Sequence, residues 1–334
     1  MSDKNDMMLR CEGLTKRYEE IVALDHLDLA IPRGRIFGYI GHNGAGKTTT
    51  IRILAGLLKA SEGRAWIAGE EVTHGQEKIK SLVGYMPDAF GVYDQMRVWE
   101  YLDFFGAAFK IPRKERRERI DHVLDITRGE YLRDRFVDTL SKGMKQRVGI
   151  ARTLLHDPEV LLLDEPASGL DPKARIEMRE LLRKLADGGK TLLVSSHILP
   201  ELAAICDSIG IIHSGKLRAA GDIHDVLAEL RRDRLMEVKT LDDGLAAVKV
   251  LTAADGADKI ERSEDEAGVI RFQFSGDDES LAAMVARLQG AGVRLVTCRE
   301  VPLSLEDAYM SISGIGSGLP EEQDTETPAQ EAPA

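Results

Sequence analysis

The residues with the clearest chemistry form one glycine-rich stretch, Gly41-His42-Asn43-Gly44-Ala45-Gly46-Lys47-Thr48, which fits the pattern G-x-x-x-x-G-K-[ST]. Glycines let the backbone curl around an anion, and successive backbone N–H groups can then point at phosphate oxygens. Lys47 adds a positive charge for the β- and γ-phosphates, and the Thr48 hydroxyl is a ligand for Mg2+. The stretch therefore predicts a nucleoside triphosphate site, with Thr49 as the last residue of the phosphate-binding group.

Two carboxylates follow the apolar run Val160–Leu163 directly. Four consecutive apolar residues predict a strand buried on both faces of a parallel sheet, and such sheets bind ligands at the carboxyl ends of their strands. Asp164 is suited to hold Mg2+, and Glu165 to orient and polarise an attacking water. His197 ends another apolar run, so we expect it at the same edge, in contact with phosphate or water. A structural histidine is the alternative there.

The surrounding sequence predicts the elements that position these groups. Residues 35–40 read as a strand and 48–58 as a helix, the flanks that a phosphate-binding loop requires. Residues 8–31 read as two edge strands, and 98–128 as a helical stretch. Ser141 is a good N-cap for a helix that runs to about residue 155. Further predictions are a strand and turn over 63–72, a strand over 83–86, a turn over 168–172 before a helix, a strand over 191–197, and a hairpin from 209–213 and 216–221.

Taken in order, these motifs resemble the nucleotide-binding subunit of ATP-binding-cassette (ABC) transporters over about residues 8–230. Residues 41–48 are similar to the Walker A motif of that family and 161–165 to its Walker B. The stretch Ser141-Lys142-Gly143-Met144-Lys145-Gln146 resembles the signature, normally Leu-Ser-Gly-Gly-Gln. Residues 168–171, including Asp171, resemble the D-loop, and His197 the switch histidine. Tyr18, which the pattern alone leaves as either a base-stacking or a core tyrosine, falls where the family keeps an aromatic residue that stacks on adenine.

The resemblance implies an α/β P-loop NTPase fold, with a RecA-like core, an antiparallel β subdomain and a helical subdomain that carries the signature. It implies a head-to-tail homodimer around two ATP molecules, in which Ser141 and Gly143 approach the γ-phosphate bound by the other copy. The single cassette, the stretch Trp99-Glu100-Tyr101-Leu102 and the C-terminal extension resemble ABC-2-type exporters. In these the transmembrane permease is a separate polypeptide. The chain would then be cytoplasmic and peripheral on the cytoplasmic face of the membrane through its permease partner.

Two departures from the family pattern concern the site. Lys142 and Met144 stand where the signature normally has Gly and Gln, although Ser141 and Gly143 are kept. Asp88 stands where the family keeps its Q-loop glutamine. A carboxylate can bind Mg2+ directly or through water, but it cannot donate a hydrogen bond as glutamine does. Asp88 is therefore a third metal-site candidate, beside Thr48 and Asp164.

The last hundred residues have a different pattern. Strands are predicted over 235–240, 269–274 and 293–297, with helices over 245–251 and 280–289, an order that suggests βαββαβ and a small ferredoxin-like α+β domain. The stretch 303–309 resembles the ending of exporter cassettes. We expect three regions: an ABC ATPase cassette over 8–230, an accessory α+β domain over 235–312 that serves dimerisation or regulation, and a disordered acidic tail over 314–334.

Composition narrows the possible functions. The 334 residues have a formal net charge of −11, which argues against a nucleic-acid-binding surface, and no nucleic-acid partner is expected. The basic run 110–119 contains Glu115 and Glu118 and reads as a solvated helix face. Two rivals to the exporter subunit remain: a soluble, non-transport ABC ATPase acting on nucleic acid or ribosomes, and a nucleotide-binding regulator that acts through its C-terminal domain. The transported substrate cannot be read from this chain.

Overall fold

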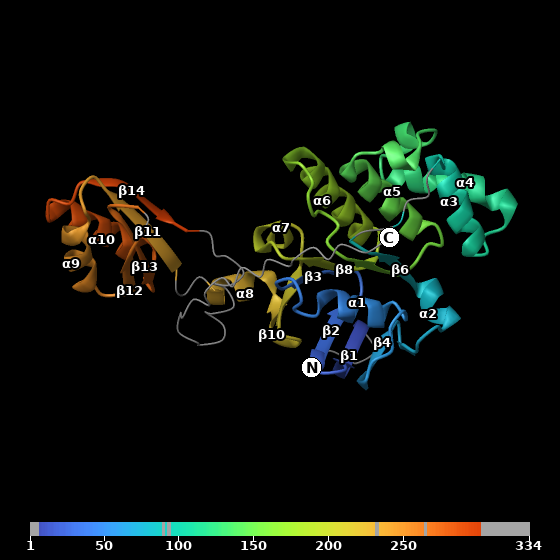
Figure 1. Cartoon of the computed structure of the whole chain (residues 1–334), viewed down its shortest axis with the longest axis horizontal. Coiled ribbons are helices and arrows are strands. Elements are labelled where there is room, and N and C mark those ends of the chain that lie inside the picture. The colour runs from blue at the N-terminus through green and yellow to red at the C-terminus, as the bar shows by residue number, and fades with distance from the viewer. Residues whose placement is uncertain (1–6, 89–90, 92–94, 231–233, 264–265, 302–334) are drawn as a thin grey trace, which may run out of the picture.

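The computed structural model describes residues 7–88, 91, 95–230, 234–263 and 266–301 (Figure 1). The side chains of 227–230 are also outside the description. The exporter-like ending predicted over 303–309 and the acidic tail over 314–334 lie outside the described residues. Within those residues, the strands form three sheets.

The central sheet carries the predicted catalytic groups. Its spatial order is β10-β9-β3-β8-β7-β6, and every neighbouring pair is parallel except β9 and β10, which form the predicted hairpin. Because the carboxyl ends of parallel strands lie at one edge, the segments after β3, β7 and β8 come together. The strands are β3 Ile36–Ile40, β6 Val83–Met86, β7 Val160–Leu163, β8 Thr191–Ser196, β9 Ser208–His213 and β10 Lys216–Asp222.

Both faces of this sheet are buried, as its continuous apolar runs predict. Along β3, Ile36 and Ile40 belong to a core shared with helices of one face, while Phe37 and Tyr39 belong to the core of the other. The alternation follows from the two-residue period of a strand. Figure 1 shows α5 and α6 over one face, and α1 together with a second sheet over the opposite one. These helices are α1 Lys47–Leu54, α5 Lys142–Leu154 and α6 Pro172–Asp187.

The second sheet is antiparallel, with the order β2-β1-β4-β5. The prediction of two edge strands over residues 8–31 is therefore wrong for β1, which lies between β2 and β4, whereas β2 is at an edge. The apolar side chains of β1 and β2 pack against α1 in one core, which contains Leu14, Leu27 and Ile51. The strands are β1 Met7–Tyr18, β2 Ile21–Pro32, β4 Glu62–Ile67 and β5 Glu70–Glu71; α2 Glu77–Leu82 leads into β6.

The predicted helical stretch 98–128 is two helices, α3 Val98–Ala108 and α4 Arg113–Ile126. The chain breaks at Lys110, which has a left-handed φ of 61°, and resumes after Pro112, which caps α4. Proline has no N–H for a continuing helix and restricts the residue before it, so the break has a local cause. The remaining short helices of this region are η1 Glu130–Leu132 and η2 Val137–Thr139, and α7 Leu199–Ala203 and α8 Ile223–Leu230 follow later in the chain.

The C-terminal unit has the predicted βαββαβ order, and its sheet order β12-β13-β11-β14, antiparallel throughout, is that of a ferredoxin-like fold. Figure 1 shows it apart from the other two sheets. The final strand begins two residues later than predicted, and β12 is a strand that the pattern did not single out. The elements are β11 Arg234–Thr240, α9 Leu245–Thr252, β12 Ala257–Arg262, β13 Val269–Phe274, α10 Asp278–Gly290 and β14 Leu295–Glu300.

Candidate functional site

The glycine-rich loop connects β3 to α1, in the strand–loop–helix context that the motif requires. Gly46 has a φ of 112°, and a Cβ there would meet the carbonyl oxygen of Ala23 at 2.7 Å. A Cβ on Gly41 would meet the carbonyl oxygen of Ile212 at 2.5 Å. The loop is therefore wedged between β2 and β9 so closely that these two positions have no room for a side chain. His42, Asn43 and Gly44 form its outer part, and Thr49 is half-buried in the first turn of α1.

Lys47, the first residue of α1, is only 6% exposed, and its ammonium group lies inside the curled loop. Its Nζ donates to the carbonyl oxygens of Gly41 at 2.5 Å and His42 at 3.3 Å. It also lies 3.4 Å from Glu165 Oε1. A buried ammonium needs such partners, because an unpaired buried charge is costly. The cation is thus held where the loop surrounds it, in position to meet an incoming polyphosphate.

Asp164 follows β7 and is 2% exposed. Both of its carboxylate oxygens accept hydrogen bonds, Oδ1 from Ser195 Oγ at 2.7 Å and Oδ2 from Thr48 Oγ1 at 2.7 Å. A hydroxyl and a carboxylate in contact are hard oxygen donors, which suit Mg2+. No group of three or more acidic, histidine or cysteine side chains forms a metal cluster within the described residues.

Glu165, which follows β7, contacts both the phosphate loop and the end of the neighbouring strand β8. Its backbone has a left-handed φ of 49°, and its N–H donates to Ser195 Oγ at 3.0 Å. Its Oε2 lies 3.0 Å from His197 Nδ1 and its Oε1 faces Lys47. The structure thus brings Lys47, Thr48, Asp164, Glu165 and His197 together at one edge of the central sheet.

Ser141 and Asp171 lie away from this cluster, at two helix N-termini. Ser141 Oγ accepts from the N–H of Met144 at 3.4 Å and caps α5, as predicted, and Asp171 Oδ1 accepts from Ala174 at 2.9 Å and caps α6. The two ends are neighbours, since a Cβ on Gly143 would lie 3.5 Å from the Ala174 Cβ. None of the hydrogen bonds and ion pairs of the described residues links Ser141, Gly143 or Asp171 to the phosphate loop of the same chain.

Tyr18 and Asp88 are not drawn into the cluster either. Tyr18 ends β1, is 42% exposed and lies under the Lys16 ammonium group, 5.0 Å from it. It stands at the β1–β2 hairpin, the same hairpin whose Ala23 abuts Gly46. Asp88 is exposed just after the edge strand β6, and among the described contacts it has neither a hydrogen bond nor an ion pair with the loop.

Sequence reasoning missed Ser195, which is fully buried near the end of β8. Its hydroxyl donates to Asp164 and accepts from the N–H of Glu165, so one side chain orients both carboxylate residues. The available signal was a hydroxyl residue inside an apolar strand run, directly before a second serine and His197. A buried hydroxyl needs partners, and here both partners are functional candidates.

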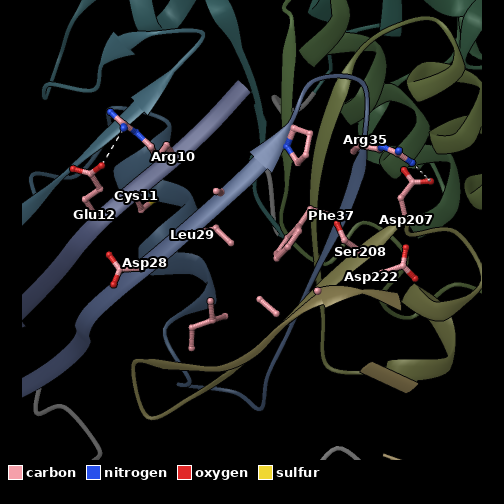
Figure 2. Close-up of a pocket in the computed structure, with 15 residues that line it drawn as sticks. Arg10, Cys11, Glu12, Asp28, Leu29, Arg35, Phe37, Asp207, Ser208 and Asp222 are labelled. Atoms are coloured by element: carbon pink, nitrogen blue, oxygen red, sulfur yellow. Dashed lines mark ion pairs between the residues drawn. The ribbon is translucent and has the colours of Figure 1, made fainter. Parts of the chain in front are cut away.

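A separate cavity of about 660 Å³ lies at the other end of β3, between the antiparallel sheet and the β9–β10 hairpin (Figure 2). Its charged groups are largely paired with one another, Arg10 with Glu12 at 3.0 Å and Arg35 with Asp207 at 3.9 Å. Burial raises the pKa of the Cys11 thiol, which also lines it, to about 12, so this thiol is no nucleophile near neutral pH. None of the residues predicted to bind phosphate or Mg2+ lines this cavity.

Three features of this site are those of a P-loop nucleoside triphosphatase. They are the phosphate-binding loop with its buried lysine, the hydroxyl–aspartate pair, and the glutamate held by a histidine. The ABC transporter family model matches residues 24–168. The chain is 35% identical to Nod factor export ATP-binding protein I of Ralstonia nicotianae, covering 92% of this chain and 94% of that protein. It is 36% identical to the bacitracin transport ATP-binding protein BcrA of Bacillus licheniformis, covering 93% and 98%.

Among solved structures, the dimeric post-hydrolysis state of the ATP-binding cassette MJ0796 bound to ADP and Pi matches with a TM-score of 0.59 at 26% identity. The match covers 65% of this chain and 99% of that one. This chain belongs to the family of ABC transporter ATP-binding proteins. It is an ATP-binding and ATP-hydrolysing subunit, and its fold is the ABC cassette followed by a ferredoxin-like unit. Within the described residues, no helix is long and apolar enough to cross a bilayer.

Proposed function

We propose that this chain powers an exporter, hydrolysing ATP at the cytoplasmic face of a membrane and driving separate permease subunits. The observation that carries the proposal is the meeting of Lys47, Asp164 and Glu165 at one edge of the central sheet. Support for export comes from the relatives, two of which are named for Nod factor export and bacitracin transport. The rival role on nucleic acid or ribosomes finds no support in these names.

In the proposed reaction, the loop 41–49 binds the phosphates through its N–H groups and Lys47. The phosphates compete with Glu165 for the Lys47 ammonium group, which now lies 3.4 Å from Oε1. Loss of that contact leaves Oε1 able to accept a proton from a water, while His197 holds Oε2 in place. The water then attacks the γ-phosphorus, and ADP leaves as the bond between the β–γ bridging oxygen and the γ-phosphorus breaks.

Thr48 and Asp164 are the proposed Mg2+ holders, and Asp88 is a weaker third candidate. When bound, the ion neutralises charge that develops on the β- and γ-phosphate oxygens. Ser195 holds one oxygen of Asp164 at 2.7 Å, so the carboxylate keeps its other oxygen toward Thr48. This arrangement fixes the hard oxygen donors before the ion arrives.

The remaining site residues fit a head-to-tail dimer. Because residues 141–146 resemble the family signature, we assign Ser141 and Gly143 to the nucleotide of a second copy. Asp171 shapes the adjacent D-loop by capping α6, and Tyr18 is assigned to the adenine ring. The dimeric form of the MJ0796 cassette supports this arrangement. We assign residues 8–230 to the motor, and 235–312 to an accessory domain for dimerisation or regulation.

The start of α3 is the proposed permease contact. Trp99 and Phe136 are 37% and 40% exposed, and they are close together, because Arg97 forms a backbone bridge with Phe136 and the Trp99 N–H bonds to the Arg133 carbonyl. The Arg97 guanidinium lies over the Phe136 ring, 4.9 Å from its centroid, so exposed aromatic rings stand beside an arginine here, two residue types that protein interfaces favour. A cytoplasmic segment of the permease would cover these residues.

The substitution Glu165→Gln tests the proposal. It keeps the size of the side chain and removes the base, so phosphate release should fall at least about 100-fold while ATP-bound dimers accumulate. Glu159→Gln is the matched control, because Glu159 precedes the same strand and pairs with exposed Arg33, far from the loop. Phosphate release and size-exclusion chromatography with Mg-ATP are the measurements. Unchanged hydrolysis in the Glu165→Gln protein would remove Glu165 from its role.

A further inference from the structure

We propose that the ion pair between buried Glu201 and half-buried Arg175 positions the D-loop, residues 168–171, and thereby couples the two nucleotide sites of a dimer. Glu201 is on α7, just after His197, and Arg175 is in the first turns of α6, just after the D-loop. The inference rests on the proposed function, because only in a head-to-tail dimer does the D-loop side of one copy serve the ATP of the other.

Glu201 is tied to the strand end that carries His197. It is 6% exposed, and its Oε2 accepts from Ser196 Oγ at 3.4 Å. The same hydroxyl accepts from the N–H of Ile198 at 3.0 Å, so Glu201 is linked to the residues on both sides of His197. The Ser196 carbonyl also accepts from the Gly41 N–H at 3.4 Å. A displacement of the phosphate loop or of the histidine therefore reaches Glu201 through two bonds.

Arg175 carries the connection to the D-loop. Its Nε lies 3.0 Å from Glu201 Oε1, and its Nη2 donates to the carbonyl oxygen of Leu170 at 3.2 Å. The Nε–H does not point at the carboxylate, so the contact is an ion pair without a hydrogen bond. A small cavity of about 20 Å³ borders Glu201 and Ser196. Because Glu201 is buried, Arg175 must follow it or leave a charge unpaired.

The D-loop in turn touches the signature of the same chain. Gly169 has a φ of 66°, and a Cβ there would lie 2.7 Å from Lys142 Nζ, so the lysine occupies the space that glycine leaves. Leu170 and Ala174 lie beside Gly143 in the same way, within 3.6 Å of the position of its missing Cβ. Contacts thus run without a gap from Gly41 and Ser196 to the signature. The signature completes the other copy's site, so the ion pair lies between the two sites.

Mixed dimers test this coupling. A double variant that carries Glu165→Gln and Arg175→Met in the same chain is mixed, in excess, with the wild-type protein. Phosphate release is then measured per wild-type subunit at saturating Mg-ATP. The wild-type site then keeps all its own residues and borrows only the D-loop and signature of the variant. We expect a rate about two- to thirty-fold lower than with the single Glu165→Gln protein as partner, the range of effects of residues that modulate coupling between sites. Chromatography checks that equal amounts of mixed dimer form.

The matched control is Glu165→Gln with Arg183→Met. Arg183 lies on the same helix and also joins a carboxylate, Asp207 at 2.9 Å, and a backbone carbonyl, that of Ile205, but it touches neither the D-loop nor the segment around His197. This partner should leave the wild-type rate unchanged. A partner with Glu165→Gln and Glu201→Gln should slow the wild-type rate as much as the partner with Arg175→Met does. A partner that carries Glu165→Gln with both Arg175→Met and Glu201→Gln should slow the wild-type rate no more than the stronger of the two changes alone. Melting temperatures identify a variant that fails to fold, and the Glu201→Gln arm then decides.

Equal effects of Arg175→Met and Arg183→Met, or effects of Arg175→Met and Glu201→Gln that multiply, would overturn the coupling. Loss of hydrolysis together with ATP-bound dimers in the Glu165→Gln protein would leave the proposed ATPase cycle supported even then. If that protein forms no ATP-bound dimers, both proposals fall together.

Discussion

Ser195→Ala should damage both stability and turnover, because one hydroxyl holds both carboxylate residues of the site. The change removes the hydrogen bond to the buried Asp164 carboxylate and the acceptor for the Glu165 N–H. A bond to a charged group contributes about 1.5–3 kcal/mol, and an unsatisfied N–H costs about 1–3 kcal/mol, so we expect a loss of about 2.5–6 kcal/mol in unfolding free energy. Without these bonds the Glu165 carboxylate is aimed less accurately, and kcat should fall by about one to two orders of magnitude.

Thr191→Val is the control for Ser195→Ala. Thr191 lies at the opposite end of β8, is buried, and its hydroxyl likewise accepts a backbone N–H, that of Gly34 at 2.9 Å. Its replacement should cost about 1–2 kcal/mol and leave kcat per folded molecule unchanged. Urea unfolding and steady-state phosphate release measure the two quantities. A Ser195→Ala protein with the stability and the kcat of the Thr191→Val protein would refute the assignment of Ser195 as a positioning residue.

Two further substitutions test local features. Gly46→Ala should lower the free energy of unfolding by about 2–6 kcal/mol, through backbone strain and overpacking. Gly44 has a φ of 79° but open space around it, so Gly44→Ala should cost only about 1–3 kcal/mol. Urea unfolding compares the two proteins, and equal losses would contradict the close packing of the loop at Gly46. Burial lowers the pKa of His156, whose Nε2–H donates to the Val83 carbonyl and whose buried Nδ1 has no hydrogen-bond partner among the described residues, so that a proton added there would be unsatisfied. The neutral form of His156 therefore stabilises the folded state above about pH 6.5, and this contribution is lost as the pH falls through the lower folded-state pKa. Between about pH 7 and 5, the melting temperature of the wild type should fall more steeply than that of the His156→Asn protein. Parallel curves would refute this.

The sequence predicted the chemistry better than the geometry. A phosphate-binding loop follows from local residue types, and the strands that carry Asp164 and His197 follow from apolar runs, so the meeting of these residues at one sheet edge could be expected. The role of Ser195 could not be predicted, because it depends on β7 and β8 being neighbours. The Glu201–Arg175 pair likewise joins residues far apart in the chain, whose contact only the packing of α6 and α7 creates.

The errors in the predicted elements have identifiable causes, some local and one long-range. Pro112 was a visible signal for the break between α3 and α4, which the continuous amphipathic pattern around it concealed. The residues of β12, an edge strand of the C-terminal sheet, are mostly exposed and show no clear alternation of apolar and polar side chains. The sequence therefore contains no periodic signal that would predict this strand. The place of β1 inside its sheet depends on its pairing with β4, about fifty residues later.

The left-handed backbone of Glu165 has a consequence for protein engineering. A glycine or asparagine would adopt that conformation with less strain, which costs other residues about 1–2 kcal/mol. A screen that selects only for heat resistance would therefore favour replacing this glutamate, and under the proposed mechanism the selected proteins would be more stable but would no longer hydrolyse ATP efficiently. Thermostabilisation would therefore have to retain Glu165 on purpose, while other non-glycine residues with a left-handed backbone, such as Ala68, remain open to replacement.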